Sequence, residues 1–512
     1  LHIFADIEAS NNGLSLNIGK DLDGEVRSST PDIGADEFDN PDNEAGAVKL
    51  MNTPTQVCSA TLPLIAAVRN YGDMPMTSVT VNWSVNGVVQ PVVNWTGSVL
   101  PGDSAFVTLS NFFFAPSSAY NFVVWTSLPN GQPDPVPSND SYSSQTIYTM
   151  MQGAYTVGGV SPDYPTISSC VAALIQRGVC GPVVFNIRPG TYTDYLNFDG
   201  NNMNGLSWTN TVTFQSEALD STSVEMNCSN ASGSPLWMIN TSRAKHLIFR
   251  YMTFTRTLSS GWGTSNNLMI FDIANHITLE HCVFRSHTNL IGKGIMFDRS
   301  SNIKVHNCVF KSMYSCLRIG QDANSTDKNV SVQNNRFYNF KEKAFEVYSI
   351  EDSLEIKNNY FTNDSLVLSD GQATNTEALL ATLCGGMVEI MNNRVEGRYG
   401  ETAVHVSCMN GTPAYKVKVY NNFIAAGSGF TSGFQGTVAL EMYTNNYIDV
   451  QYNTINLYNN SWSQSGPYCR GAVQMNATPC YNIRFKNNII RADSLIGAFF
   501  FSTFQLEYDH FF

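Results

Sequence analysis

A short segment is repeated along the C-terminal half of the chain, and one of its positions is occupied in different copies by arginine, glutamate or histidine. Each copy begins with a small residue and has apolar residues at its second and fourth positions. In a strand, the third residue then points away from the apolar side, so the third residues form one outward column. The column is Met296, Arg318, Glu346, Leu380, His405, Glu441 and Gln474.

Side chains of these types could cleave a polysaccharide by β-elimination. That reaction needs a base such as Lys, His or Arg, and a cation to neutralise the uronate. His405, with Arg398 and Glu401 near it in sequence, is the best local set, and Arg318 beside Glu346 is the next. The structural alternatives are a solvated position for His405 and a weak ion pair between Arg318 and Glu346. No catalytic residue is assigned from the sequence. If the protein is an enzyme, Arg318, Glu346 and His405 are the candidates.

Hydrolysis of a glycosidic bond sets a geometric condition that the column does not meet. Two carboxylates must stand roughly 5 to 9.5 Å apart. Neighbouring strands lie about 4.8 Å apart, so Glu346 and Glu441, three copies apart, are separated by roughly 14 Å. We therefore expect a non-catalytic protein, with a polysaccharide lyase or glycoside hydrolase as the alternative.

The elements that must position the column are indicated by an eight-residue pattern that follows each copy. It reads apolar, any, apolar, two variable residues, Asn or Cys, any, apolar, from residues 277–284 to 483–490, with a weaker copy at 247–254. Intervals of roughly 24 to 35 residues are typical of a solenoid, in which each coil buries its apolar face only against its neighbours. The alternation predicts a short strand that ends in a bend.

The sixth position of the pattern forms a second column, which we interpret as structural. A buried amide can bond to the amide of the next coil and to the backbone of the bend, and Cys is a compact substitute that tolerates burial. The predicted ladder is Cys282, Cys308, Asn335, Asn359, Asn393, Asn422, Asn453 and Asn488.

Two strands and a variable loop per coil resemble the right-handed parallel β-helix (pectin-lyase-like) family, over residues 151–512. Residues 167–175 place Ile167, Val171, Leu174 and Ile175 on one face of a helix, which we expect to cap the first coil. The segments YTVGG, GPVVFNI and PGTYTD resemble the start of β-helices in secreted adhesins of Bacteroidota. This repeat is specific to the fold and not to a function.

Residues 41–150 have a different pattern, with alternating apolar strands separated by Gly, Pro, Asn and Asp turns. Short strands at this spacing predict an antiparallel sandwich. NYGDMP, WSVNG, LPGDSA and PSNDS resemble an immunoglobulin-like adhesion module of the CARDB type, and the Pro-rich run 129–137 is an edge loop or linker. The expected fold class is thus all-β, a β-helix preceded by an immunoglobulin-like sandwich.

The first forty residues of the chain resemble the closing segment that the β-helix at its C-terminal end lacks. Residues 1–40, with DLDGEVRSSTPDIGADEFDN, resemble the closing segment of a preceding β-helix, whereas FQLEYDHFF at the end resembles a coil interrupted before its closing segment. We therefore expect a piece of a tandem array of β-helix and sandwich units, truncated at its C-terminus.

Composition excludes some partners. Charged residues make up 14% of the 512, and the net charge of −13 disfavours nucleic acid and anionic membranes. No apolar run reaches the roughly 18 residues of a spanning helix, so we expect no membrane insertion within this segment.

Cysteines and carboxylates give two weaker indications. Eleven cysteines are present, of which Cys170 with Cys180, and Cys469 with Cys480, are close enough in sequence for local disulfides in an oxidising compartment. No motif with metal-ligand spacing occurs, so no cofactor is expected. An acidic run could bind a structural calcium ion at the 21–44 junction, with a solvated linker as the alternative. It comprises Asp21, Asp23, Asp36, Glu37, Asp39, Asp42 and Glu44.

Aromatic residues in the loops are candidates for glycan contact, because their rings could stack on sugar faces. They are Trp208, Trp237, Trp262, Trp462 and Tyr468, and the alternative is that they pack over the flank of the solenoid. The resemblance to Bacteroidota proteins also implies candidate O-glycosylation at Ser104, Ser353, Ser365 and Ser494.

Together these patterns favour an extracellular, cell-surface structural or adhesive protein, a unit of a long stalk or fibre. Its expected partners are neighbouring copies or repeat units, and surface glycans reached through the loops. A third class, a glycan-binding module without catalysis, would lose binding when Trp262 or Trp462 is replaced.

Overall fold

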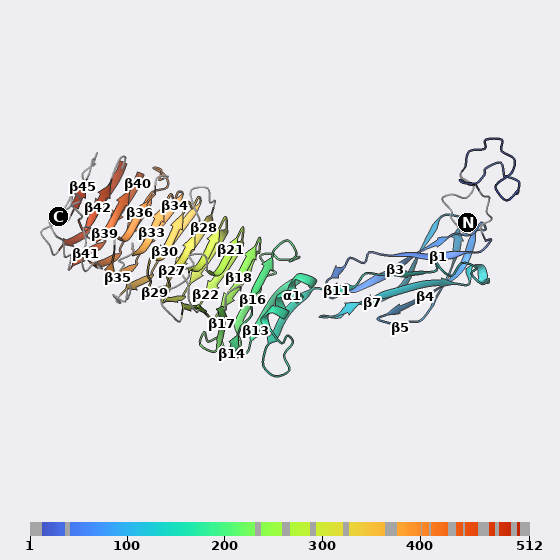
Figure 1. Ribbon diagram of the computed structural model, residues 1–512, viewed down its shortest axis with the longest axis horizontal. Helices are drawn as coiled ribbons and strands as arrows, with labels where there is room; N and C mark the ends of the chain where they lie inside the picture. The colour runs from blue at the N-terminus through green and yellow to red at the C-terminus, as the bar shows by residue number, and fades with distance from the viewer. Residues whose placement is uncertain are drawn as a thin grey trace. The chain divides into compact units, whose positions relative to one another are not determined.

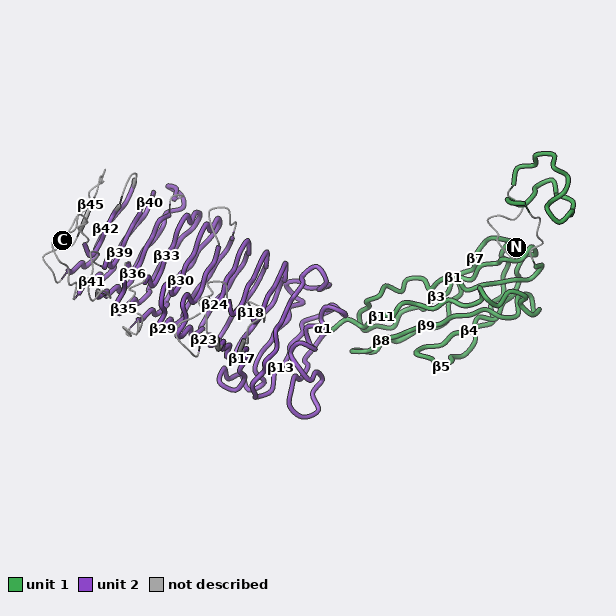
Figure 2. Tube along the Cα trace, viewed as in Figure 1, with its two compact units in different colours: residues 1–151 green, residues 152–512 purple. Residues whose placement is uncertain are grey.

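The computed structural model describes residues 13–35, 41–230, 237–258, 267–286, 293–320, 327–363, 376–400, 402–408, 411–428, 437–443, 446–458, 471–476, 481–492 and 499–501. The chain divides into two compact units, residues 1–151 and 152–512 (Figure 2). Each unit has its own set of sheets, and the protein is all-β apart from a helix and one 3-10 turn, as far as these residues show.

Unit 1 is an antiparallel β-sandwich. One sheet has the order β1-β3-β7, and the other has the order β10-β9-β4-β5, with β6 also paired to β4. Alternate residues of both sheets, such as Val68, Val81, Val107 and Val124, are buried in one shared core. A third, small sheet has the order β2-β11-β8.

The strands of unit 1 are β1 (Ala45–Met51), β2 (Gln56–Val57), β3 (Thr61–Asn70), β4 (Met76–Val85), β5 (Val88–Val89), β6 (Val93–Val99), β7 (Ser104–Phe113), β8 (Ala119–Tyr120), β9 (Phe122–Ser127), β10 (Ser141–Ser143) and β11 (Ile147–Thr149). The 3-10 turn η1 (Pro129–Gly131) lies in the Pro-rich run between β9 and β10.

Residues 13–35 precede the sandwich. They contain one isolated antiparallel bridge, between Lys20 and Val26, and no longer strand. The Arg27 guanidinium donates to the carbonyl of Gly34, which closes the segment on itself. The likeness of residues 1–40 to a β-helix closing segment stays a prediction.

Unit 2 is a parallel β-solenoid, as the repeats predict, and the fold class is confirmed. Successive coils add one strand to each of three long sheets, which run side by side along the solenoid (Figure 1). We name these sheets A, B and C, in the order in which the chain passes through them in each coil.

Sheet A consists of β12 (Met151–Val157), β13 (Val179–Ile187), β16 (Val212–Ser216), β19 (Leu247–Arg250), β22 (Asn275–Glu280), β25 (Ser301–His306), β28 (Lys328–Gln333), β31 (Ser353–Lys357), β34 (Met387–Met391), β37 (Val417–Tyr420), β40 (Asn446–Gln451) and β43 (Tyr481–Lys486).

Sheet B consists of β14 (Gly190–Tyr192), β17 (Val224–Asn230), β20 (Thr253–Leu258), β23 (Val283–Ser286), β26 (Val309–Lys311), β29 (Arg336–Tyr338), β32 (Tyr360–Asn363), β35 (Arg394–Tyr399), β38 (Phe423–Ser428), β41 (Thr454–Tyr458) and β44 (Ile489–Ala492).

Sheet C consists of β15 (Leu196–Asp199), β18 (Trp237–Ser242), β21 (Asn267–Asp272), β24 (Lys293–Asp298), β27 (Ser315–Ile319), β30 (Lys343–Tyr348), β33 (Glu377–Thr382), β36 (Thr402–Ser407), β39 (Val438–Tyr443), β42 (Val473–Asn476) and β45 (Phe499–Phe501).

The bend between sheets A and B explains the Asn and Cys column. The residue before each ladder position has a left-handed backbone, for example Asn358 with φ 56° and Asn392 with φ 58°, a conformation that Asn tolerates. The buried Asn359 amide then donates to the side-chain oxygen of Asn393 over 3.1 Å and to the carbonyl of Val332 over 2.9 Å.

The same contact repeats along the column. Asn335, Asn359, Asn393, Asn422 and Asn453 each donate to the amide oxygen of the next member, the last being Asn488. Cys308 joins the column through its backbone N–H, which donates to Asn335, and Cys282 is buried above it. Buried polar groups along the bends are thus satisfied by one another.

Stacked apolar residues fill the interior of the solenoid. The last residue of the eight-residue pattern places Phe254, Phe284, Phe310, Phe337 and Phe361 in one buried column. Successive rings stack with centroids 5.3, 5.0, 4.7 and 4.7 Å apart. Such stacking adds to the burial of large apolar surfaces.

Helix α1 (Ile167–Arg177) packs against β13 and β15 at the first coils. Thr166 and Ser169 form a capping box at its start. Of the predicted apolar face, Ile167, Val171 and Leu174 are buried, whereas Ile175 is half-buried. No helix in the described ranges is long and apolar enough to cross a membrane.

The proposed disulfide between Cys170 and Cys180 is wrong. Cys170 is a free thiol on the buried face of α1, whereas Cys180 at the start of β13 is disulfide-bonded, as is Cys58 in unit 1. The helix turns Cys170 into the core, and closeness in sequence does not bring the two sulfur atoms together. Cys469 and Cys480 lie outside the described residues.

Candidate functional site

The outward column predicted from the sequence lies on sheet C. Strand register pairs Met296 with Arg318, Arg318 with Glu346, Glu346 with Leu380, Leu380 with His405, His405 with Glu441, and Glu441 with Gln474. Glu346 and Glu441 are three strands apart, as expected. The column therefore exists, although its charged members are largely buried.

Glu346 is the centre of one part of this column. Its carboxylate accepts a hydrogen bond from the Tyr348 hydroxyl over 2.8 Å. Arg318 Nε lies 3.7 Å from one carboxylate oxygen, and Lys343 Nζ lies 3.5 Å from the other. The Arg318 guanidinium also lies over the Tyr348 ring, 5.3 Å from its centroid. Burial and the charge of Glu346 raise the pKa of Tyr348, so its hydroxyl stays protonated.

Glu377 connects this group to His405. Lys343 and Glu377 are register partners, and Lys343 Nζ lies 3.7 Å from a Glu377 oxygen. The other Glu377 oxygen lies 3.9 Å from His405 Nδ1, which in turn lies 3.8 Å from Glu441. Thr402 donates to the same Glu441 oxygen over 2.8 Å. Positive and negative side chains thus alternate along the sheet, and we call this set the sheet C network.

Burial opposes protonation of His405, but the carboxylates of Glu377 and Glu441 outweigh it and raise its pKa. A raised pKa increases the fraction of His405 that is protonated at neutral pH, so less of it is available as a general base. Of the two other members of the predicted set, Arg398 is exposed on β35 of sheet B and does not join His405. Glu401 lies outside the described residues.

Sequence reasoning missed Lys343 and Glu377, and with them the close carboxylates. Lys343 Nζ lies 3.5 Å from an oxygen of Glu346 and 3.7 Å from an oxygen of Glu377, so these two carboxylates flank one cation. Alternation assigns Lys343 to the side of the buried Phe345. Instead Ala344 and Phe345 are both buried, because the alternation breaks at the small residue. The charged residues Lys343 and Glu377 each stand immediately before the small first residue of a copy, and this position was the signal available in the sequence.

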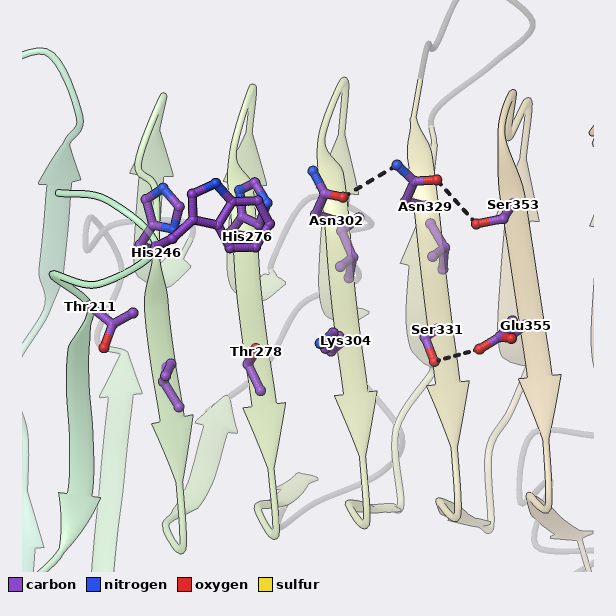
Figure 3. A pocket seen from close by; sticks show the side chains of 14 residues that line it. Thr211, His246, His276, Thr278, Asn302, Lys304, Asn329, Ser331, Ser353 and Glu355 are labelled. Atoms are coloured by element: carbon purple, nitrogen blue, oxygen red, sulfur yellow. Dashed lines mark hydrogen bonds between the residues drawn. The ribbon is translucent and has the colours of Figure 1, made fainter.

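A second candidate site is a groove of about 380 Å³ on the outer face of sheet A, which we call the sheet A groove. It crosses β19, β22, β25, β28 and β31 (Figure 3). Its lining contains Trp208, Thr211, His246, His276, Thr278, Asn302, Lys304, Asn329, Ser331, Ser353 and Glu355.

One end of the groove is aromatic. Trp208 is 75% exposed, yet the centroid of its indole lies 3.8 Å from that of the His276 ring and 5.7 Å from that of His246. The two histidine rings stack on each other with centroids 4.6 Å apart. Burial lowers the pKa of both histidines, and their neighbouring cations add to this, so both are uncharged at neutral pH. Neither ring nitrogen of His276 has a hydrogen-bond partner within the described part.

The rest of the groove is polar. Asn302 accepts from the Asn329 amide over 3.3 Å, and Asn329 accepts from the Ser353 hydroxyl over 3.1 Å. In a second row, Ser331 donates to Glu355 over 3.3 Å, and Figure 3 shows Lys304 on the neighbouring strand. Each coil therefore presents a new polar side chain, about 4.8 Å from the last.

The other predicted contact residues are scattered. Trp237 is the half-buried first residue of β18, and Trp262, Trp462 and Tyr468 lie outside the described residues. Ser104 is exposed at the start of β7, and Ser353 lies in the sheet A groove. Ser365 and Ser494 lie outside the described residues.

The acidic residues at 21–44 do not form one site in the described ranges. The Asp21 carboxylate accepts from the backbone of Asp23 and Glu25 within its own turn. Asp36, Glu37 and Asp39 lie outside the described residues. Glu44 belongs instead to a group with Asp134 and Asp140 in unit 1.

No protein-family model matches the chain, and no curated protein matches it either. Among solved structures, a domain attributed to a cell surface protein of Methanosarcina acetivorans is 22% identical, with a TM-score of 0.19, and the match covers 22% of this chain and 94% of that one. A CARDB domain from Pyrococcus furiosus, determined in complex with di-metal ions, is 19% identical with a TM-score of 0.19, covering 23% of this chain and 100% of that one.

The solenoid has neighbours among enzymes. Pectin methylesterase from Aspergillus niger is 12% identical with a TM-score of 0.28, and the match covers 70% of this chain and 92% of that one. Structures similar to this chain thus include surface domains as well as a pectin-active enzyme. At these identities and TM-scores the likenesses carry no argument about activity.

Proposed function

We propose that the chain is an extracellular structural module whose solenoid holds an extended, uncharged glycan in the sheet A groove. The observation that carries this proposal is the Trp208 ring, which is mostly exposed while its position is set by contact with His276. A fixed aromatic surface binds the apolar face of a sugar at little cost in side-chain entropy.

The polar part of the groove fits the same ligand. Asn302 on β25, and Asn329 and Ser331 on β28, present amides and a hydroxyl on two neighbouring coils. These groups can both donate to and accept from sugar hydroxyls. Lys304 and Glu355 balance each other in charge, which favours a neutral over an acidic glycan.

A mechanical role is supported by the continuity of the solenoid. Sheets of eleven and twelve strands, and the Asn ladder beside them, give hydrogen bonds that run along the whole unit. Disulfide-bonded Cys58 and Cys180 favour an oxidising, extracellular compartment. In this account neighbouring units of the same kind continue the stalk, on a cell surface.

A glycoside hydrolase is the second candidate function. It is favoured by one observation, the two carboxylates of Glu377 and Glu441 on either side of His405. One observation argues against a hydrolase. Every charged group of the sheet C network has an oppositely charged neighbour, as in a chain of structural ion pairs.

Binding to a glycan array tests the proposal. The full chain would be applied to neutral and acidic glycans, and the tightest ligand titrated by calorimetry against Trp208→Ala. We expect a neutral glycan and a loss of affinity of about tenfold, or 1.4 kcal/mol. Tyr415→Ala, which removes an exposed aromatic residue outside the groove, is the matched control. Unchanged binding by the Trp208 variant would overturn the proposal.

A further inference from the structure

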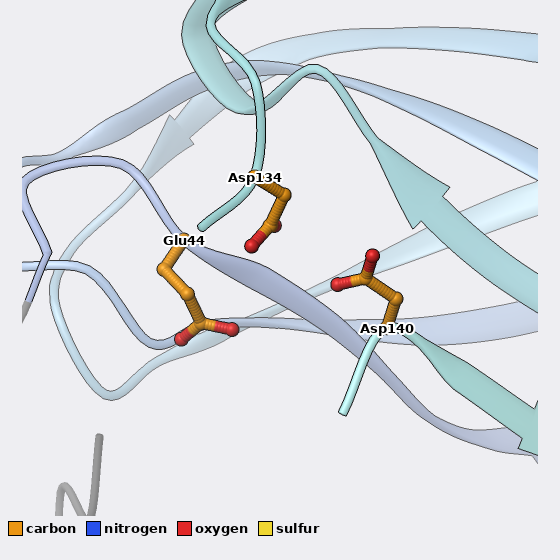
Figure 4. Close-up of side chains that lie close together, drawn as sticks. All are labelled: Glu44, Asp134 and Asp140. Atoms are coloured by element: carbon orange, nitrogen blue, oxygen red, sulfur yellow. The ribbon is translucent and has the colours of Figure 1, made fainter. Parts of the chain in front are cut away.

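Three carboxylates from distant parts of the chain meet in unit 1. Glu44 lies just before β1, Asp140 just before β10, and Asp134 in the loop between η1 and β10 (Figure 4). One oxygen of each lies within 4.8 Å of the others. Like charges this close repel one another unless protons or a cation neutralise them.

Backbone hydrogen bonds fix this arrangement. The carbonyl of Glu44 accepts from the N–H groups of Tyr71 and Gly72 over 3.0 and 3.1 Å. The Asp134 carboxylate accepts from the N–H groups of Ala45 and Val136, both over 3.0 Å, so the Pro-rich loop is held against the start of β1.

Asp140 is held in the same way. Its carbonyl accepts from the N–H groups of Ala47 and Thr126, both over 3.1 Å. The site is therefore built from three segments whose backbones are tied to the sandwich.

The burial of the Glu44 side chain is a second, independent observation that points to a cation. Its side chain is fully buried, with 0% exposure, and neither of its carboxylate oxygens accepts a hydrogen bond in the part of the chain that the structure describes. One oxygen of Asp140 is also buried without a hydrogen-bond partner among the described residues. A buried carboxylate without a partner is costly, and it is stable only if it is protonated or bound to a cation.

The pKa values of Glu44 and Asp140 reflect their burial and the closeness of the other carboxylates. Burial, together with Asp134 and Asp140, raises the pKa of Glu44 to about 7, although the neighbouring Asn139 side chain offsets part of the shift. Burial and Asp134 raise the pKa of Asp140 to about 6. No Lys or Arg forms an ion pair with these three residues within the described ranges.

We infer that Glu44, Asp134 and Asp140 bind one calcium ion. Oxygen is the only donor element here, which suits a hard cation and disfavours zinc or copper. Calcium accepts carboxylate and amide oxygens in irregular geometry, and water completes its six to eight ligands. The ion joins β1, β10 and the Pro-rich loop, and so closes one end of the sandwich.

Calorimetry on the full chain, stripped of metal with a chelator, tests the inference with calcium chloride as the titrant. We expect one site, with a dissociation constant of about 10⁻⁴ to 10⁻³ M, as in extracellular calcium modules.

Two variants and one control decide the result. Glu44→Gln should abolish this site while keeping the fold, since it removes a buried charge, and Asp140→Asn should weaken binding at least tenfold. Asp103→Asn, at an exposed carboxylate of the same unit outside the group, should bind as the wild type does. Calcium should also raise the first unfolding midpoint of the wild type but not of Glu44→Gln. Equal binding by the wild type and Glu44→Gln, or no binding at millimolar calcium, would overturn the inference.

Discussion

His405 Nδ1 lies 3.9 Å from a carboxylate oxygen of Glu377, on the neighbouring strand of sheet C. This contact joins the two halves of the sheet C network, since Glu377 also faces Lys343 and His405 also faces Glu441. The stability of the solenoid therefore depends on the charge state of His405.

The first prediction concerns pH. The pKa of His405 in the folded chain is raised, so its ion pairs contribute stability that is fully present below the unfolded pKa of about 6.5. That contribution is lost as the pH rises through the folded-state pKa. The difference in unfolding midpoint between the wild type and His405→Gln should therefore be largest near pH 5.5 and shrink above pH 7. His281→Gln, at an exposed histidine, is the control. A difference that grows with pH would contradict this account.

The second prediction concerns Lys343, which separates Glu346 from Glu377. Lys343→Met removes the buried cation and leaves two carboxylates facing each other. We expect a loss of about 1–3 kcal/mol at pH 7, measured by denaturant unfolding, and a smaller loss near pH 4, where the carboxylates protonate. Lys328→Met removes an exposed pair with Glu351 and should change stability by less than about 1 kcal/mol. Equal effects at both pH values would show that the pairing of charges is not the cause.

The third prediction concerns the ladder. Asn393 accepts from the backbone and side chain of Asn359, and it donates to Ile356 and Asn422. Asn393→Ala leaves several buried polar groups without partners, so we expect a loss of about 2–4 kcal/mol in the free energy of unfolding. Asn393→Cys should lose less, because Cys308 occupies the equivalent position in an earlier coil. A loss below about 0.5 kcal/mol for the Ala variant would show that the column does not stabilise the solenoid.

The fourth prediction concerns the cysteines. Among the described residues, seven buried cysteines form no disulfide, namely Cys170, Cys228, Cys282, Cys308, Cys316, Cys384 and Cys408. They should react with an alkylating reagent only after unfolding, whereas Cys58 and Cys180 should also require a reductant. Peptide mass mapping distinguishes the two sets. A peptide that contains Cys170 linked to Cys180 would contradict the structure.

The coils of the solenoid were predictable because their signals are local. Each strand and each ladder residue follows from alternation and a recurring Asn within a few residues. The network around Glu377 could not be predicted in this way, because burial does not alternate around Ala344 and Ala378. Four consecutive residues are buried in β30 and five in β33. Contacts between coils, such as Trp208 with His276, depend on the loop path and have no signal in the spacing of the sequence.

The acidic group of unit 1 shows the same limit. The sequence gives a reason to consider Glu44 with its acidic neighbours at 21–42, whereas the structure brings it to Asp134 and Asp140, about ninety residues away in the chain. Hydrogen bonds from the N–H of Ala45 to the Asp134 carboxylate and from the N–H of Ala47 to the Asp140 carbonyl hold these distant segments together.

The central claim, that the sheet A groove holds a neutral glycan without cleaving it, is tested most directly by measuring binding and turnover on the same sample. The tightest array ligand would be incubated with the full chain, and both the bound fraction and the products, measured as new reducing ends, would be followed. We predict saturable binding that Trp208→Ala weakens about tenfold, with the glycan intact throughout. Product formation that disappears in Glu377→Gln or His405→Ala would contradict the claim and place the function on sheet C.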